Sequence, residues 1–223
     1  MQDQRAELEW RDGGVPVSRR FDDPYFSLEN GLAETQHVFL AGNGLPDRLV
    51  PGFHIAELGF GTGLNFLVAW AAWKAREIAG TFHFTSFEAF PMSLSDIEKA
   101  HAAFPELAEE AAALRAVWTG GALSVPLGDA HLRLITGDAR STLRDWTGLA
   151  DAWFLDGFSP AKNPELWEPE LLASVWQHTC EGGTAATYTA AGHVRRALQA
   201  AGFTVTRQAG YGRKRHMTTA VKP

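Results

Sequence analysis

The sequence has few of the features that mark disulfide-linked or zinc-binding proteins. Cys180 is the only cysteine in 223 residues, which excludes an intramolecular disulfide and a cysteine-rich zinc site. None of the eight histidines is followed by another one four residues later, so the helical spacing of paired metal ligands is missing as well. We therefore expect no metal.

Membrane-spanning and secretory segments are also lacking. The longest apolar run, Phe66 to Trp73, stops at Lys74 and falls well short of the roughly 20 residues that cross a bilayer. The first residues mix acidic and basic side chains and lack the basic-then-apolar order of a signal peptide. These absences predict a cytoplasmic protein without membrane attachment.

Positive charge is scarce overall but is concentrated near the C-terminus. The formal net charge is −6, which argues against a protein that coats nucleic acid. Residues 180–223 nevertheless carry seven Lys and Arg residues against one acid, Glu181. This basic region is either a local phosphate-binding surface or an ordinary solvated face, and charge alone does not separate the two.

The order of local patterns predicts one α/β domain. Residues 1–50 are rich in turn formers and are expected to be an N-terminal extension that packs on a core domain of residues 51–223. Alternating apolar residues predict strands at 53–58, 82–87, 151–155 and 183–189, a hairpin of 123–127 with 131–135, and two last strands at 203–207 and 216–221. Helical spacing predicts helices at 64–79, 93–104, 165–179 and 193–201.

Two of these helices carry terminal signals, because Ser95 and Glu98 form a possible capping box and Gly202 follows the last helix. Strands that alternate with helices indicate a mainly parallel sheet covered on both faces.

The first strand leads into a glycine-rich turn, Glu57-Leu58-Gly59-Phe60-Gly61-Thr62-Gly63. Glycines at such a turn allow the ribose and amino-acid portions of a nucleoside cofactor to approach the backbone closely. The spacing differs from the Gly-x-Gly-x-x-Gly that holds a dinucleotide pyrophosphate, so a methyl donor without phosphates fits better than NAD or ATP. The expected cofactor contacts here are Glu57, Gly59, Phe60, Gly61, Gly63 and Asn65.

Two acids at the ends of later strands extend this cofactor site. Glu88 follows Gly63 by 25 residues and is placed to accept the ribose hydroxyls, or is an ordinary strand-end acid. Asp138 in Gly137-Asp138-Ala139 either accepts the adenine amine or caps the next helix, and the residues leave both open.

A third acid, Asp156, emerges from an apolar strand into a loop that contains Pro160 and Pro164. Open α/β sheets bind substrates at such strand ends, which makes Asp156 the catalytic candidate and a further cofactor contact. A turn-forming Asp before Gly157 is the simpler interpretation of this residue taken alone.

Several segments together resemble the methyltransferase module of the MnmC family, in its stand-alone, MnmD-like form. They are residues 21–27, 30–35, 59–66, 151–167 and 210–215. The resemblance implies a class I, Rossmann-like S-adenosylmethionine-dependent methyltransferase with an antiparallel C-terminal strand. It further implies methylation of the primary amine of 5-aminomethyl-2-thiouridine at tRNA position 34. Bifunctional relatives also carry an FAD-dependent oxidase module, which we expect to be absent because the chain ends at Pro223.

For such a reaction, Asp156 is expected to receive a proton from the attacking amine and to stabilise the charge that develops on it. Unstacked anticodon bases rest on aromatic rings, and phosphates bind basic side chains. The expected tRNA contacts are Tyr25, Phe26, Phe158, Pro160, Asn163, Trp167, Arg195, Arg213, Lys214 and Arg215, with Tyr211 and Arg196 as further candidates.

Three other functions remain open at this point. A methyltransferase acting on a small-molecule or protein amine would carry the same cofactor motifs. A nicotinamide oxidoreductase is disfavoured by the glycine spacing. A non-catalytic RNA-binding module would bind tRNA without a saturable cofactor site.

Overall fold

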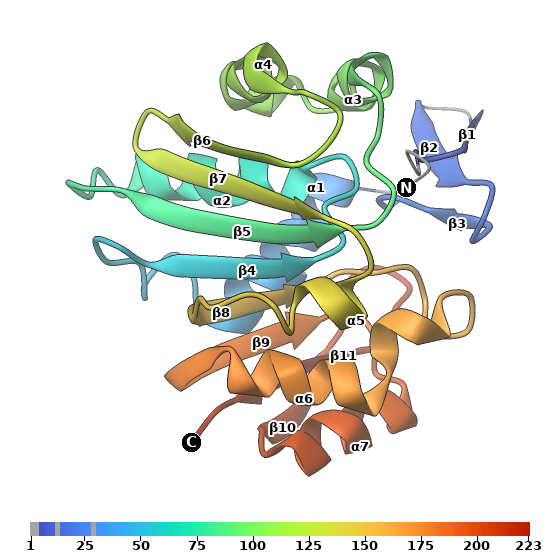
Figure 1. Cartoon of the computed structure of the whole chain (residues 1–223), viewed down its shortest axis with the longest axis vertical. Helices are drawn as coiled ribbons and strands as arrows, with labels where there is room; N and C mark the ends of the chain where they lie inside the picture. Colours follow the sequence, from blue (N-terminus) through green and yellow to red (C-terminus); the bar gives the residue numbers. More distant parts are fainter. Residues whose placement is uncertain (1–4, 12–13, 28–29) are drawn as a thin grey trace.

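An eight-stranded sheet forms the centre of the computed structural model, which describes residues 5–11, 14–27 and 30–223 (Figure 1). Across the sheet the strands lie in the order β10 (Thr204–Ala209), β11 (His216–Val221), β9 (Thr179–Thr187), β8 (Ala150–Leu155), β4 (His54–Leu58), β5 (Phe82–Glu88), β7 (Ala130–Thr136) and β6 (Leu123–Leu127). The strands from β9 to β7 are parallel, whereas β6, β10 and β11 pair antiparallel with their neighbours. This confirms the predicted α/β fold with antiparallel C-terminal strands.

Alternation along the strands gives the sheet two apolar faces. In β8, Ala152 and Phe154 join one buried cluster, while Trp153 and Leu155 join the other. Helices α2 (Leu64–Ala75) and α4 (Ala108–Val117) contribute to the first cluster; α5 (Ala139–Thr142), α6 (Pro169–Gln177) and α7 (Gly192–Ala201) contribute to the second. Figure 1 shows α5, α6 and α7 in front of the sheet and α2 behind it. No helix of the described residues is long and apolar enough to cross a membrane.

The N-terminal residues build a second, smaller sheet. Strands β1 (Leu8–Arg11), β2 (Val15–Ser18) and β3 (Asp23–Pro24) pair antiparallel and are followed by α1 (Gly31–Thr35), a π-helix η1 (Gln36–Leu40) and a short η2 (Ala41–Asn43). Figure 1 places this sheet beside the edge at which β5 ends. The division of the chain at residue 50 stays a prediction.

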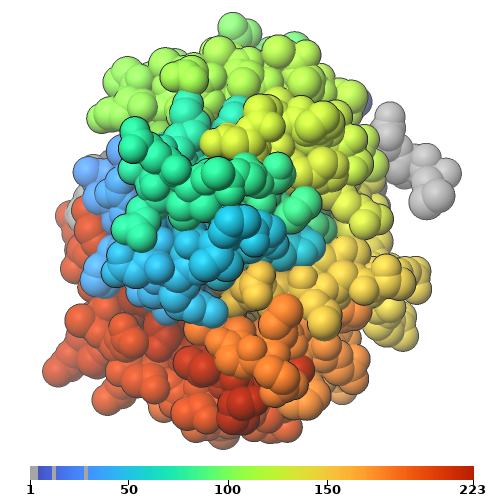
Figure 2. Space-filling view, turned by 90° about the vertical axis from the view of Figure 1, so that its left-hand side faces the viewer, coloured from blue at the N-terminus to red at the C-terminus, as the bar shows by residue number. Residues whose placement is uncertain are grey.

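Viewed from the edge at which β4 and β5 begin, α3 (Leu94–His101) and α4 lie at one end of the molecule and the C-terminal third at the other (Figure 2). The binding edge described below is the opposite one, where the parallel strands end.

Several predicted boundaries differ from the observed ones. Helix α2 ends at Ala75 rather than residue 79, because Glu77 has a positive φ of 51°. Ser93, not Ser95, caps α3 by accepting the Asp96 N–H. The predicted helix 165–179 is divided into η4 (Pro164–Trp167) and α6, because Glu168 precedes Pro169 and is extended. Strand β9 begins at Thr179 rather than at residue 183.

Candidate active site

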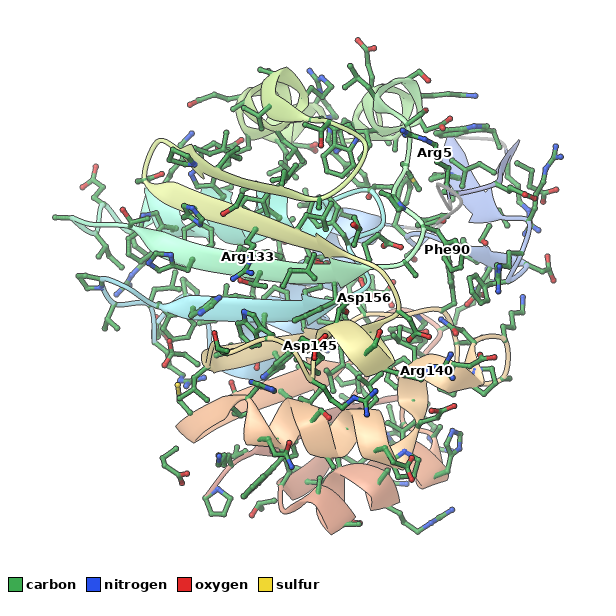
Figure 3. All side chains as sticks on the ribbon, in the orientation of Figure 1. Arg5, Phe90, Arg133, Arg140, Asp145 and Asp156 are labelled. Carbon is green, nitrogen blue, oxygen red and sulfur yellow. The ribbon has the colours of Figure 1, made fainter. Side chains whose placement is uncertain are left out.

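A cavity of about 690 Å³ opens at the carboxyl ends of the central parallel strands. Its wall combines the loops after β4, β5, β7 and β8 with the N-terminal segment and with residues 211–214 between β10 and β11. Figure 3 shows Asp156, Phe90 and Arg140 at this edge of the sheet. The volume suits a small organic cofactor together with part of a substrate.

The glycine-rich turn after β4 forms one wall of the cavity. Gly59 and Gly61 line it with φ values of 90° and 55°, a backbone region that favours glycine. A Cβ on Gly59 would collide with the backbone carbonyl of Asp156, and one on Gly61 would lie 3.0 Å from the Tyr25 ring. Glycine at position 59 therefore lets the β4 and β8 loops approach each other, and glycine at position 61 lets Tyr25 pack on the turn.

Glu88, at the end of β5, buttresses this turn. Its carboxylate accepts the Gly61 N–H at 2.9 Å on one oxygen and the Phe90 N–H at 2.7 Å on the other. Burial raises the pKa of Glu88, and these backbone donors oppose that rise. Glu88 lines the cavity.

Asp156 and Glu57 are joined by a shared amide. The Nδ2 of Asn65 donates to Glu57 Oε1 at 2.8 Å and to Asp156 Oδ2 at 2.6 Å, while Thr35 Oγ1 donates to Asn65 Oδ1 at 3.0 Å. Ser86 Oγ donates to the second oxygen of Glu57 at 2.6 Å. The amide orientation follows from the chemistry, since two carboxylates must face the NH₂ group.

The burial of this network changes its acid–base properties. Burial raises the pKa of Asp156 from an ordinary 3.8 to about 7, against the opposing effects of Asn65 and Lys214. The pKa of Glu57, which is fully buried, is also raised well above its usual range. Asp156 thus reaches the cavity as a carboxyl group that changes charge near neutral pH.

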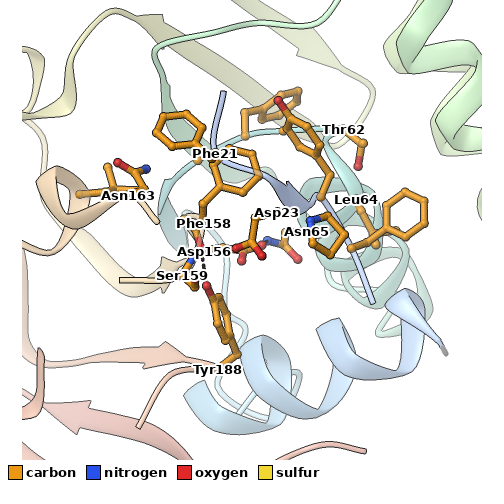
Figure 4. Close-up of a pocket in the computed structure, with 18 of the residues that line it drawn as sticks. Phe21, Asp23, Thr62, Leu64, Asn65, Asp156, Phe158, Ser159, Asn163 and Tyr188 are labelled. Atoms are coloured by element: carbon orange, nitrogen blue, oxygen red, sulfur yellow. Dashed lines mark hydrogen bonds between the residues drawn. The ribbon is translucent and has the colours of Figure 1, made fainter. Parts of the chain in front are cut away.

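The loop after β8 is fastened to the N-terminal segment. Asp23 accepts the Ser159 N–H at 2.8 Å, and Lys162 Nζ lies 3.2 Å from Asp22 Oδ2 and 3.6 Å from Asp23 Oδ1. Figure 4 shows Asp23, Asn65 and Asp156 gathered in the same part of the cavity. The N-terminal segment, which was expected to pack on the core and to supply Tyr25 and Phe26, therefore forms part of the cavity wall.

Aromatic rings line the mouth next to Asp156. Phe158 stacks on Phe21 at 4.8 Å between centroids and meets the Tyr25 ring edge-on at 4.9 Å. Phe26, which also lines the cavity, packs edge-on against Phe104 at 5.0 Å. These rings form an apolar surface suited to a flat base.

The cavity wall also holds an ion pair. Lys214 Nζ donates to Glu34 Oε1 at 2.7 Å and lies 4.0 Å from the centroid of the Tyr188 ring. The Tyr188 hydroxyl donates to the carbonyl of Gly157 at 2.7 Å, one residue after Asp156. The loop between β10 and β11 is thus linked to the loop that carries Asp156.

Most of the expected site residues line this cavity. They are Tyr25, Phe26, Gly59, Phe60, Gly61, Asn65, Glu88, Asp138, Asp156, Phe158, Asn163, Arg213 and Lys214, together with Tyr211.

Asp138 caps the next helix, which is one of its two suggested roles, while the contact with adenine stays a prediction. It accepts the Arg140 N–H at the start of α5 and forms an ion pair with the Arg140 side chain at 2.6 Å, which lowers the pKa of Asp138. It also lines the cavity.

Other expected contacts lie outside the cavity wall for identifiable reasons. Glu57 is buried behind Asn65, and Gly63 begins α2 with Phe60 and Leu114 packed against the position of a Cβ. Trp167 is buried, and its indole N–H donates to the Phe158 carbonyl at 2.9 Å, so it supports the loop rather than offering a face to a base.

The basic residues that were expected to bind phosphate are divided in the same way. Arg195, which lies on α7, does not line the cavity, and Arg215 does not line it either. The same is true of Pro160, an expected contact of another kind. Arg213 and Lys214 do line the cavity.

Several residues that line the cavity were not predicted as site residues from the sequence, among them Phe21, Asp23, Glu34 and Tyr188. The first three fall within the segments 21–27 and 30–35 on which the family resemblance rested, so a signal was present. Tyr188 follows β9 and had no local pattern to distinguish it from a core tyrosine.

Comparisons with known proteins agree with this geometry. The sequence model of a family described as S-adenosyl-L-methionine-dependent methyltransferase matches residues 105–223. The chain is 45% identical, over 97% of its length, to the tRNA 5-methylaminomethyl-2-thiouridine biosynthesis bifunctional protein MnmC of Hahella chejuensis, of which it covers 36%. The chain thus spans about a third of the length of this curated relative.

Solved structures give the same result for the fold. The crystal structure of MnmC2 from Aquifex aeolicus superposes with a TM-score of 0.73 at 27% identity, over 98% of this chain and 71% of that one. A precorrin-6y C5,15-methyltransferase from Geobacter metallireducens shares the fold with a TM-score of 0.55 at 12% identity, over 96% of this chain and 100% of that one.

Proposed function

The chain belongs to the S-adenosyl-L-methionine-dependent methyltransferase family, and on this premise we propose that it methylates the primary amine of 5-aminomethyl-2-thiouridine at tRNA position 34. The family confirms the predicted methyl donor. The name of the Hahella chejuensis relative supports the substrate, and the proposal carries that relative's tRNA over to this chain. A tRNA substrate also agrees with a cytoplasmic location.

The residues at the glycine-rich turn fit such a donor. Gly59 and Gly61 line the cavity, and Glu88 presents carboxylate oxygens for ribose hydroxyls. Asp138, next to Gly137, lines the same cavity and would face the adenine amine. When bound, S-adenosyl-L-methionine supplies an electrophilic methyl group on a positively charged sulfur.

The main support for the proposal is the position of Asp156 in the cavity together with its raised pKa. An alkylamine has an ordinary pKa of about 10 and must lose a proton before its nitrogen can attack. Asp156, with a pKa of about 7, is better matched to take up that proton than a carboxylate with an ordinary pKa. Within the described residues, Asn65 occupies Oδ2 and leaves Oδ1 to face the amine.

The surroundings of Asp156 favour a cationic acceptor. Asp23, Glu34 and Glu88 line the same cavity and attract an aminomethyl ammonium group before it is deprotonated. Asn65 holds the Asp156 carboxylate in one orientation, which keeps its second oxygen aimed at the reacting nitrogen.

The mouth of the cavity supports a base from a single-stranded loop. The rings of Phe158, Phe21 and Tyr25 form a surface on which an unstacked uracil would rest. Arg213 and the neighbouring exposed Arg215 are placed to contact phosphates outside the mouth. The resulting affinity should fall as salt concentration rises.

Transfer of labelled methyl groups tests the proposal against its nearest alternative. Enzyme and labelled donor are incubated with tRNA that carries the aminomethyl group, with tRNA that lacks it, and with the free aminomethyl nucleoside. We expect incorporation only with the first. Equal incorporation into the free nucleoside or into added protein amines would instead support a small-molecule or protein methyltransferase.

A further inference from the structure

Lys214 lines the cavity, although 45% of its side chain is exposed, and its partners line the cavity too. Its Nζ contacts Glu34 Oε1 at 2.7 Å and the Tyr188 ring at 4.0 Å, and both partners line the same cavity as Asp156. The Glu34 side chain is only 12% exposed, which makes its charge costly without a partner. This arrangement differs from that of a side chain extended to bind phosphate.

The loop that carries Lys214 is built to hold this orientation. The Gly210 N–H donates to the Arg215 carbonyl at 3.2 Å, and the Lys214 N–H donates to the Tyr211 carbonyl at 3.0 Å. A Cβ on Gly210 would collide with the carbonyl of Lys214, so the loop closes tightly only with glycine there. His37 fixes the start of the loop through a 3.0 Å hydrogen bond with the Ala209 carbonyl.

We propose that Glu34 and Lys214 are positioning residues of opposite sign that set the charge state of Asp156 from the cavity wall, and that Lys214 is not a phosphate contact. This inference rests on the proposed function for its kinetic consequence. A positive charge near Asp156 favours the carboxylate, whereas a negative charge favours the protonated acid. Burial raises the pKa of Asp156, and the two residues shift it in opposite directions.

Other ionisable groups face Asp156 as well, but they are held by different partners. Glu57 shares the Asn65 amide, Glu88 accepts two backbone N–H groups, Asp23 accepts the Ser159 N–H, and the Tyr188 hydroxyl donates to Gly157. Lys214 lowers the pKa of Asp156 and Glu34 raises it. The Lys214–Glu34 ion pair can therefore be mutated without removing the hydrogen bond that Asn65 donates to Asp156.

The opposite signs of the two charges provide the test. The pH dependence of kcat/KM for aminomethyl tRNA is measured for the wild type, Lys214→Met and Glu34→Gln. We expect the acidic limb of the profile to move to higher pH by roughly one unit in Lys214→Met and to lower pH in Glu34→Gln. Simple loosening of the cavity would move both variants in the same direction, and that result, or no movement, overturns the inference.

Two controls separate this role from phosphate binding. Lys214→Arg keeps the charge and should restore the wild-type limb. Arg215→Met removes a neighbouring exposed charge that does not line the cavity, and it should raise KM for tRNA and reduce the salt dependence without moving the limb. If Lys214→Met behaves like Arg215→Met, Lys214 is a phosphate contact and the inference is wrong.

A second readout needs neither donor nor tRNA. Carboxyl-carbon NMR of aspartate-labelled enzyme, with Asp156 assigned from Asp156→Asn, reports the titration of Asp156 directly. We expect the same opposite movements in Lys214→Met and Glu34→Gln. A wild type without tRNA-dependent turnover would refute the proposed function alone, whereas an unmoved Asp156 titration would refute this inference alone.

Discussion

Replacing Asp156 by asparagine removes the proposed proton acceptor while keeping the size of the side chain. The amide oxygen of the variant can still accept the hydrogen bond from Asn65, which occupies Asp156 Oδ2 at 2.6 Å. It cannot take a proton from the attacking amine. A positioned general base is worth about 10²- to 10⁴-fold, and we expect kcat to fall within this range. Donor affinity, measured by calorimetry, should change little.

The same substitution should change stability with the opposite sign. Because burial raises the pKa of Asp156 to about 7, the folded state holds this proton more tightly than the unfolded chain does. An acid with a raised folded pKa stabilises the protein at low pH, and that stability is lost as pH rises from the ordinary value near 3.8 to about 7. Asparagine has no such dependence.

The magnitude follows from the cost of a pKa difference, 1.36 kcal/mol for each pH unit. Between about pH 5 and about pH 7.5, the variant should gain about 2 kcal/mol relative to the wild type, reduced somewhat by screening from cavity water. Urea unfolding at the two pH values measures this gain. A slower enzyme that becomes relatively more stable is the expected combination.

Asp145→Asn is the matched control, since it removes the same charge from an exposed residue outside the cavity. It should alter neither the rate nor the pH dependence of stability. Wild-type turnover in Asp156→Asn would refute the role of Asp156 as a base. A stability difference that stays constant with pH would refute its buried, neutral-pH titration.

Three further substitutions test other parts of the structure. Asn65→Ala leaves the carboxylates of Glu57 and Asp156 without their shared donor. It should lower the unfolding free energy by about 2 to 3 kcal/mol at neutral pH, as measured by urea titration. An unchanged value would contradict the hydrogen bonds that Asn65 makes to the two carboxylates. Gly59→Ala combines a positive φ with a backbone collision, so it should lower the unfolding free energy by at least about 3 kcal/mol and abolish donor binding. Gly52→Ala, with a φ of 81° and open space, should lower it by only about 1 kcal/mol. Equal losses would show that the close approach of Gly59 to the Asp156 carbonyl is unimportant. Burial lowers the pKa of His54 to about 4 from 6.5, so the stability contributed by its neutral ring is lost as pH falls from 6.5 towards 4. At about pH 5, the unfolding free energy of His54→Gln should therefore rise by about 1 to 2 kcal/mol relative to the wild type. Parallel curves of unfolding free energy against pH would contradict this.

The central strands were predictable because their signals are local. Apolar alternation predicted the correct bounds of the last strand, His216–Val221. The hairpin strands β6 and β7 flank Gly128 and Asp129, as expected. The small N-terminal sheet was missed because β3 has only two residues and pairs through Val17 and Pro24, a contact that no short pattern announces.

The same contrast between local signals and distant contacts explains which site residues could be predicted. Gly59, Glu88 and Asp156 lie where strands end, and a strand end can be recognised from the sequence. The roles of Trp167 and Lys214 depend on distant partners, and the Lys214–Glu34 pair spans 180 residues. A basic cluster near the C-terminus indicated phosphate binding, but the fold turns one of its members into the cavity.

Mass spectrometry of nucleosides from tRNA treated with enzyme and donor tests the central claim most directly. We predict that 5-aminomethyl-2-thiouridine at position 34 disappears as 5-methylaminomethyl-2-thiouridine appears, with the new methyl group on the side-chain nitrogen, and that Asp156→Asn nearly abolishes the conversion. Methylation of the base, of the ribose or of another position by the wild type would contradict it, as would an unmodified position 34.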